Sequence, residues 1–381
     1  MSQHGLSEHS HGSFVPLQIR SERPKSTSVS DFPAIDSRQD LWRYLSVEQL
    51  RGLDADVLAE YENEIKFASA AGVKVSWIPS TDALVGSVGI PEDRVAAAAY
   101  TNASKTLLVE ISGEIAEPFN IQITGTSLDA SALHLFVKAD RLSKATVVLQ
   151  YSGTGVLGEN VEILVGDDAQ LNLVTVQNWE SSSAHVSAHF ASLGRNSKLK
   201  HTVAAFGGDL VRVTPVTTFT APGAEVEMNG VYFANSHQHM EMRPFVDHAA
   251  PNCKSRVTYK GALSGDKAHT VWIGDVLIRV AAEGTDTYEL NRNLLLTDGA
   301  RADSVPNLEI ETGEIQGAGH ASASGRFDDE QLFYLQARGI DELTARQLVV
   351  MGFLLELLQR TEVTQVVESL TEVLQEKLGR K

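Results

Sequence analysis

A weak internal repeat in the middle of the chain limits the fold more than any other feature of the sequence. Three small residues, Ala169, Ser197 and Ala224, are spaced by 28 and then 27 positions. Each lies in a segment that also has a turn and an aliphatic residue: GDDAQL at 166–171, GRNSKL at 194–199 and APGAEV at 221–226. A period between about 20 and 50 residues is typical of stacked repeat architectures. The repeat therefore predicts a stack of similar coils.

The surrounding segment, from about Leu107 to Ile315, has the pattern of strands. Short runs such as LLVEI at 107–111 and LHLFV at 133–137 alternate or are wholly apolar, and they end at Gly, Asp, Asn or Ser. No amphipathic pattern of about 10 to 15 residues separates the runs, which argues against a βαβ sheet. Propeller blades would need about 40 to 45 residues each. Among a propeller, a sandwich and a parallel β-helix, the β-helix fits best.

Helical patterns flank this region. The pattern is helical from Arg38 to Ala71. Within this stretch, Ser46 can cap a helix together with Gln49. The Ala-rich run at 96–99 could form a short helix. We expect four parts: a disordered tail at 1–30, a mainly helical domain at 31–104, a parallel β-helix core at 105–325 and a helical domain at 326–381.

The strand pattern changes to a helical one within residues 294–358, and His320 stands at this change. Its neighbours are all small: Gly317, Ala318, Gly319, Ala321 and Ser322. Small neighbours leave the ring free to reach a ligand or a partner surface, although a turn histidine without chemistry fits the composition equally well. The helices that follow have more apolar surface than about 50 residues can cover, so they either pack on the β region or bind a partner.

Charge and composition exclude several classes of protein. The chain has 32 Lys and Arg against 49 Asp and Glu, a net charge of -17, which disfavours binding to nucleic acid or to an anionic membrane. Its single cysteine, Cys253, permits no intramolecular disulfide, and the sequence has no signal peptide and no apolar run of about 18 residues. We therefore expect a cytoplasmic protein.

Most catalytic motifs are absent. There is no phosphate-binding loop, no nucleophile elbow and no HExxH zinc motif, and the glycines at 153–158 fit a β-turn better than a dinucleotide site. The richest group of possible metal ligands is His237, His239, His248 and Cys253. Spacing alone does not make these side chains converge, so buried structural roles are favoured over metal binding. His4, His9 and His11 are similarly more typical of a polar tail than of a metal site.

An ordered series of motifs resembles the SufB/SufD family of iron–sulfur cluster assembly scaffolds. The series is WRY at 42–44, HAAPNCKSRVTYKG at 248–261, Asn291 with LLL at 294–296, PNLEI at 306–310, His320, LFYL at 332–335 and RG at 338–339. The chain resembles SufD more than SufB. SufB-like chains have Glu after the histidine, where Ala321 stands here, and a mid-chain cysteine that residues 205–230 lack. Many SufD chains also have a cysteine at the position of Ala318.

The resemblance implies a right-handed parallel β-helix between N-terminal and C-terminal α-helical domains. It implies a non-enzymatic scaffold that pairs with a SufB-like paralogue and binds the SufC-like ATPase through its C-terminal helices, for which we name Leu335, Arg338, Leu348 and Phe353. His320 would lie at the SufB interface, either as an iron ligand or as a structural contact. We expect no cofactor in the isolated chain, a transient iron–sulfur cluster at that interface, and a possible homodimer when SufB is absent.

Two other classes of function stay open at this stage. A β-helical enzyme that acts on carbohydrate would need clustered carboxylates, and the candidates Asp266, Asp275 and Asp298 are scattered along the sequence. A stand-alone metal-binding protein would use His237, His239, His248 and Cys253.

Overall fold

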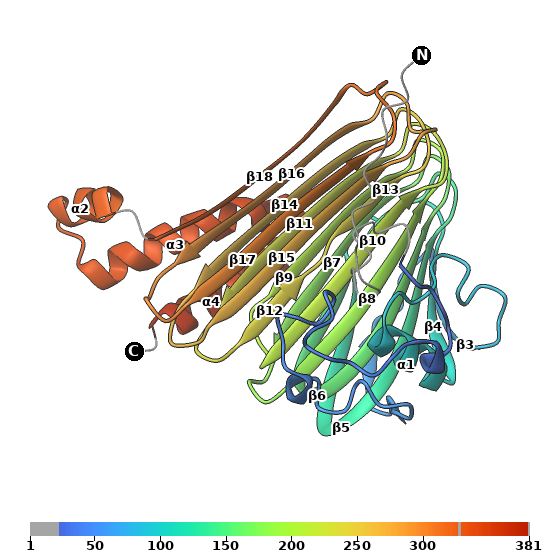
Figure 1. Ribbon diagram of the computed structural model, residues 1–381, viewed down its shortest axis with the longest axis horizontal. Coiled ribbons are helices and arrows are strands. Elements are labelled where there is room, and N and C mark those ends of the chain that lie inside the picture. Colours follow the sequence, from blue (N-terminus) through green and yellow to red (C-terminus); the bar gives the residue numbers. More distant parts are fainter. Residues whose placement is uncertain (1–22, 327–328, 380–381) are drawn as a thin grey trace, which may run out of the picture.

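The chain folds into a parallel β-solenoid of about eight turns, with 48% of residues in strands and 17% in helices. The structure is a computed structural model that describes residues 23–326 and 329–379 (Figure 1). Each turn contributes one strand to each of two stacks, and the apolar core fills the space between the stacks. The expected mainly β fold with a parallel β-helix core is confirmed.

The two stacks share the long strands β5 and β6, which pass around the corner between them. The first stack contains the starts of β5 (Phe119–Ala139) and β6 (Lys144–Val165), then β7 (Gln170–Trp179), β9 (Lys198–Ala205), β11 (Glu225–Ala234), β14 (Lys254–Leu263), β16 (Asp286–Leu295) and β18 (Gly317–Arg326). The second contains β4 (Lys105–Ile111), the ends of β5 and β6, β8 (Ala184–Leu193), β10 (Leu210–Phe219), β12 (His239–Met242) with β13 (Phe245–His248), β15 (His269–Ile278) and β17 (Arg301–Ile310).

Each copy of the sequence repeat corresponds to one turn of the solenoid. Ala169, Ser197 and Ala224 directly precede β7, β9 and β11, and each is fully buried. The residue before each of them has a positive φ, which lets the chain reverse within a short turn. Cys253 occupies the same position before β14 and is buried, and burial raises the pKa of its thiol. The prediction of a small buried residue at Cys253 is confirmed.

The two ends of the solenoid differ. At the N-terminal end, β2 (Ile65–Phe67) pairs antiparallel with β5 and β3 (Val73–Pro79) pairs antiparallel with β4, while β1 (Ala59–Glu60) runs parallel to β5. At the other end, β18 pairs with β16 and β17 pairs with β15, and within residues 23–326 and 329–379 neither strand has a second neighbour. We call this end, formed by β17 and β18, the open end.

The N-terminal segment is not mainly helical, so the helical pattern from Arg38 to Ala71 was misleading. It contains the short 3-10 helices η2 (Val29–Asp31) and η3 (Val47–Leu50), and the α-helix α1 (Arg94–Asn102) forms at the Ala-rich run as expected. The capping box of Ser46 and Gln49 is present. The chain nevertheless leaves the helical conformation at Arg51 and Gly52, which both have positive φ.

Tertiary contacts explain that difference. The apolar residues Trp42, Leu50 and Leu53 pack one by one on the outer face of the second stack, against residues that include Val156, Val186 and Leu210. Burial against a sheet needs no helical periodicity in the segment that covers it. Residues 1–22 of the expected tail lie outside the described residues, and the division into domains stays a prediction.

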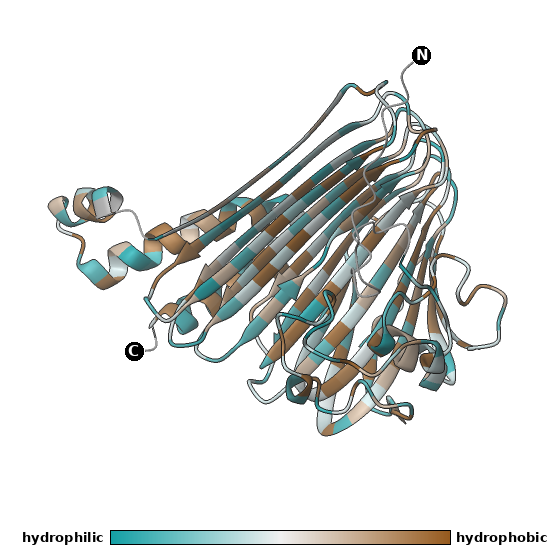
Figure 2. Ribbon diagram, in the orientation of Figure 1, coloured by the Kyte–Doolittle hydropathy of each residue, from teal (hydrophilic) through white to brown (hydrophobic). Residues whose placement is uncertain are grey.

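The C-terminal helices α3 (Glu342–Leu358) and α4 (Thr364–Gly379), joined by η4 (Gln359–Thr361), cover the outer face of the first stack. Val350, Leu354 and Leu357 pack there in one cluster with Phe206 and Phe233. In Figure 2 much of the α3 ribbon has the colour of hydrophobic residues.

The helix α2 (Asp329–Ala337) instead contacts α3 and projects away from the solenoid (Figure 1). It ends before Gly339, whose φ is positive, as is typical of a helix stop. Across residues 23–326 and 329–379, none of the helices combines the length and apolar character needed to cross a membrane.

Candidate functional site at the open end

His320 is the fourth residue of β18, in the last turn of the solenoid, and its side chain is exposed. Its register partner on β16 is Glu289. Side chains of a strand alternate between its two faces, and Ala318, two residues before His320, packs against the interior core. His320 therefore projects from the interior face, at the mouth of the solenoid.

Glu289 lies one turn deeper and is buried, with 1% of its surface exposed. Neither of its carboxyl oxygens has a hydrogen-bond partner among the described residues. Burial, followed by the negative charge of Asp275, raises the pKa of this carboxyl to about 9. Glu289 is therefore a protonated acid at neutral pH, one strand away from His320.

Three other polar atoms in this part of the interior also have no partner among the described residues: the Tyr259 hydroxyl, the Trp272 indole N–H and the Ser304 hydroxyl. The Tyr259 and Trp272 rings are 6.3 Å apart between centroids, and Trp272 is in register with Ser304. A Cβ added at Gly274 would meet both Trp272 and Glu289, so these two side chains lie close together. Buried polar groups without protein partners are typical of places that bind water, ions or ligands.

A chain of hydrogen bonds connects this interior to β18. Asn291 donates to the Tyr232 hydroxyl, which donates to Asn293 Oδ1, each over 3.0 Å. Asn293 in turn donates to Ser324 Oγ on β18 over 3.3 Å. The last turns of the solenoid are therefore lined with polar groups, whereas the turns behind them are largely apolar on this stack.

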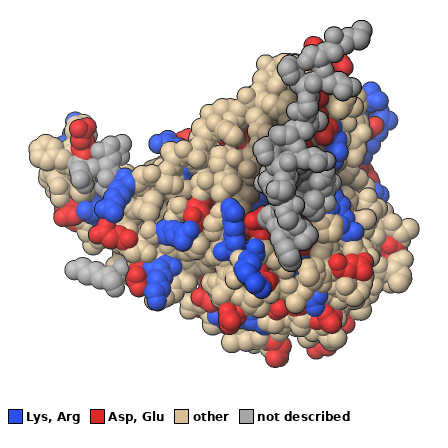
Figure 3. Space-filling model, in the orientation of Figure 1, with Lys and Arg blue, Asp and Glu red and all other residues tan. Residues whose placement is uncertain are grey.

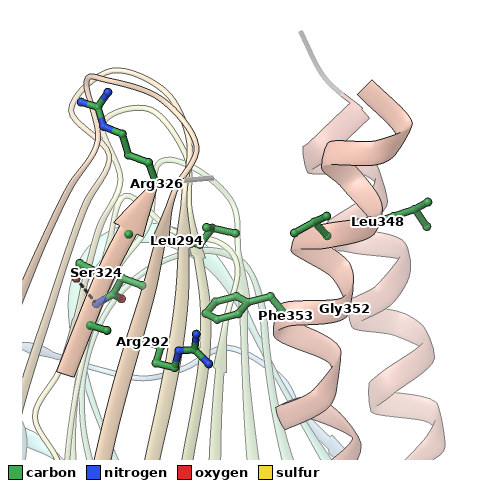
Figure 4. A pocket seen from close by; sticks show the side chains of 11 residues that line it. Arg292, Leu294, Ser324, Arg326, Leu348, Gly352 and Phe353 are labelled. Atoms are coloured by element: carbon green, nitrogen blue, oxygen red, sulfur yellow. Dashed lines mark hydrogen bonds between the residues drawn. The ribbon is translucent and has the colours of Figure 1, made fainter. Parts of the chain in front are cut away.

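The residues named for ATPase binding lie on α2 and α3 with different exposure. Arg338, just after α2, is exposed and its guanidinium lies 4.7 Å from the Tyr334 ring centroid, while Leu335 is half-buried. Leu348 is 50% exposed and lines a hollow of about 560 Å³ between α3 and the ends of β16 and β18 (Figure 4). Phe353 points from α3 toward the strands in the same view, and Lys260 Nζ lies 4.9 Å from its ring.

The histidine-rich segment does not form a metal site of its own. His237 is exposed in a turn with positive φ, His239 is buried on β12, and His248 at the end of β13 contacts Ser255 Oγ at 2.9 Å. Their side chains do not converge with Cys253, and the described residues contain no group of three or more possible ligands placed to hold a metal ion. His237 and His239 do not lie on one strand, because β12 begins at His239.

The carboxylates considered for a carbohydrate-active enzyme differ in their surroundings. Asp275 is buried on β15 and accepts a hydrogen bond from Asn307, whereas Asp266 and Asp298 are exposed in turns. Asp266 lies against Gly299, the neighbour of Asp298, so these two residues occupy adjacent exposed turns.

The surface at the open end differs in charge from the rest of the visible face. Figure 3 shows a band of largely uncharged side chains along β18, whereas Lys, Arg, Asp and Glu are scattered over the other elements. The sequence of β18, GAGHASASGR, has one charged residue, Arg326.

The fold and the site together define a class: a parallel β-solenoid with short antiparallel strands at one end, an open end that presents a histidine, and appended C-terminal helices. A family model described as "SUF system FeS cluster assembly, SufBD core domain" matches residues 121–353. The chain belongs to this SufBD family of iron–sulfur cluster assembly proteins.

Curated relatives agree with this assignment. SufBD family proteins of Mycobacterium tuberculosis and Mycobacterium bovis are each 47% identical over 363 residues, which is 93% of this chain and 91% of theirs. The SufD protein of Bacillus subtilis is 26% identical over 289 residues, 74% of this chain and 65% of its own length. Mycobacterium bovis also has a second SufBD family protein, 28% identical over 193 residues, which covers 51% of this chain and 23% of that protein.

Sequence reasoning singled out His320 but missed Glu289. In the run DTYELNRNLL the apolar residues suggest that Tyr288 and Leu290 face the core, yet Tyr288 is 44% exposed and Glu289, Asn291 and Asn293 face the interior. A usable signal was present, because Asn291 belongs to the motif series and shares the face of Glu289.

Proposed function

We propose that this protein is a non-enzymatic scaffold subunit of a SUF assembly complex, which pairs with a SufB-like paralogue through its open end and binds a SufC-like ATPase through its C-terminal helices. The observation that carries the proposal is the difference between the two ends of the solenoid. At one end β2 and β3 are short antiparallel strands, paired over three and seven residues. At the other end β17 and β18 are parallel strands of ten residues, and their outer edges have no partner among the described residues. Unpaired edges expose backbone N–H and C=O groups that pair readily with another strand.

A paralogue built from the same coil is the partner that fits this end. Two edges, β17 and β18, must be met at once, and a second solenoid offers two strands at matching spacing. Small uncharged residues on β18 permit close approach. The presence of two SufBD family proteins in Mycobacterium bovis supports pairing between paralogues. Without the paralogue, a second copy of this chain could occupy the same edges.

The nascent iron–sulfur cluster would be cargo at this interface, and the isolated chain needs no cofactor. A neutral imidazole is an established ligand of iron in clusters, and His320 lies in the last turn at the mouth of the solenoid, where a partner would cover it. Glu289 can give a proton beside it, because its carboxyl is protonated at neutral pH. A structural contact by His320 across the interface is the alternative role.

The ATPase would bind the helices that project from the solenoid. The sequence has no phosphate-binding loop, so ATP hydrolysis would come from a partner. Phe333 and Tyr334 on α2 and Leu343 and Leu348 on α3 are 46 to 72% exposed. Several exposed large apolar side chains on two helices in contact are typical of an interface. Leu335, Arg338 and Phe353 border this surface. The expected compartment is the cytoplasm.

Co-expression tests the proposal. A tag on the SufB-like paralogue should recover this chain together with the SufC-like ATPase, and removal of residues 328–381 should release the ATPase while the paralogue stays bound. If this chain co-purifies with neither the paralogue nor the ATPase, the proposal is contradicted.

A further inference from the structure

Two histidines outside the open end face each other on neighbouring strands. His239 begins β12, His269 begins β15, and the two residues are in register. Their Nδ1 atoms are 3.1 Å apart, with ring centroids 4.7 Å apart and ring planes at 79°. The pair lies on the outer face of the second stack, because Met240, the next residue, packs in the interior core.

The other nitrogen of each ring contacts a carboxylate. His239 Nε2 lies 3.2 Å from Glu241 Oε2, and His269 Nε2 lies 2.7 Å from Asp303 Oδ2. Arginines bind both carboxylates: Arg243 and Arg212 contact Glu241, and Arg301 contacts Asp303.

These contacts fix where the ring hydrogens lie. A carboxylate paired with arginine is ionised and can only accept hydrogen bonds. Each Nε2 must therefore carry its hydrogen and donate it. In a neutral imidazole the other nitrogen then has a lone pair and no hydrogen. The two Nδ1 lone pairs consequently meet at 3.1 Å, an arrangement that needs a cation between them.

The geometry points to a metal ion, and we propose that His239 and His269 bind one divalent transition-metal ion through their Nδ1 atoms, with Glu241 and Asp303 orienting the rings. With each nitrogen about 2.1 Å from the ion, the observed separation gives an angle of about 95° at the ion, between octahedral and tetrahedral values. Histidine ligands of metals regularly donate their second N–H to a carboxylate, as both rings do here.

The chemistry of the pair selects the class of ion. Two imidazoles without a thiolate suit borderline ions such as Zn²⁺, Fe²⁺, Co²⁺ and Ni²⁺. His269 retains 19% side-chain exposure, whereas His239 is 3% exposed, so the pair is reached from the His269 side. With two protein ligands, water completes the coordination. This site is separate from the proposed role of His320, which projects into the solenoid from the other stack.

Equilibrium dialysis of the full-length chain against Zn²⁺, without an affinity tag, tests the proposal. The background variant replaces His4, His9 and His11 with Gln, so that the N-terminal histidines bind no ion. We expect about one Zn²⁺ per chain, and a Co²⁺ complex whose visible absorption reports nitrogen ligation. His269→Gln should weaken Zn²⁺ binding at least about ten-fold, and Asp303→Asn should weaken it by about ten-fold through loss of the orienting hydrogen bond.

Each outcome decides the question. His237→Gln, which removes an exposed turn histidine two residues from His239, should bind like the background. Thermal unfolding checks that each variant is folded, and if His269→Gln is not, Asp303→Asn decides alone. Equal affinity in the folded variants and the background would overturn the proposal. The absence of Zn²⁺ binding in the background would also overturn it and would assign the contact to a proton shared by the two rings.

Discussion

Glu289 on β16 is in register with His320 on β18, and both side chains project toward the interior of the solenoid at its open end. The first is a buried acid without a hydrogen-bond partner among the described residues, and the second is exposed because no further turn covers it. The relationship places a group that can exchange a proton beside the residue that the last turn presents to a partner.

Replacing Glu289 with Gln should change how stability depends on pH. The folded-state pKa of about 9 lies above the ordinary value of 4.5, so between these values the folded chain holds a proton that the unfolded chain has lost. Stability from this residue therefore falls as pH rises from about 4.5 to about 9. At pH 7 Glu289 should lower the free energy of unfolding by roughly 3 kcal/mol. This value is an upper bound for the stability gained in Glu289→Gln.

Chemical denaturation of wild type and Glu289→Gln at several pH values measures this effect. The difference in unfolding free energy should grow from pH 5 to pH 8. A difference that stays constant over that range would show that Glu289 is ionised in the folded chain.

His320→Ala should lower iron–sulfur cluster delivery in cells and leave the yield of folded complex unchanged, because the exposed ring makes no contact that the fold requires. The activity of a cluster-dependent reporter enzyme measures delivery. His237→Ala, which removes another exposed histidine, is the matched control and should behave like wild type. Normal delivery by His320→Ala would remove this residue from the mechanism.

Alanine at both Phe333 and Tyr334 should weaken ATPase binding at least about ten-fold, since exposed aromatic residues often dominate the binding energy of interfaces. Both side chains are more than half exposed, so the melting temperature should change little. Val280→Ala, at a residue that is 68% exposed on the solenoid, is the control. Calorimetric titration with the SufC-like ATPase gives the affinities, and unchanged binding by the double variant would place the ATPase elsewhere.

Gly261→Ala should destabilise the solenoid by about 1 to 3 kcal/mol, the usual cost of overpacking a core. A Cβ at this position would lie 2.0 Å from the Tyr232 ring and 2.7 Å from Asn293 Oδ1, in the polar chain that leads to β18. Gly313→Ala is the matched control, because nothing lies within 4 Å of a Cβ added there. Equal melting temperatures for the two variants would contradict the packing described for the last turns.

The sequence predicted the solenoid because its information is local and repeated. Strand runs and turns recur along the solenoid, and the small residues Ala169, Ser197 and Ala224 mark three successive coils, so a few imperfect copies indicate the whole architecture. The helical prediction for the N-terminal segment failed because its apolar residues, such as Trp42 and Leu50, are buried against the sheet without forming a long helix.

The candidate site was only partly predictable, for two physical reasons. Its partners come from different turns, so the neighbours of His320 and His239 depend on the register between strands, which neither residue's own segment specifies. In addition, the interior of the last turns is polar. The apolar alternation of DTYELNRNLL therefore predicts the wrong face of β16 as the buried one, and it leaves Glu289 on the exposed face.

Hydrogen–deuterium exchange, with and without the SufB-like paralogue, tests the central claim most directly. The account predicts slower exchange of backbone amides in β17 and β18, residues 301–310 and 317–326, when the paralogue is present, because their outer edges become paired. Exchange in β2 and β3, at the opposite end, should not change. Protection confined to other elements, or none at all, would contradict the account.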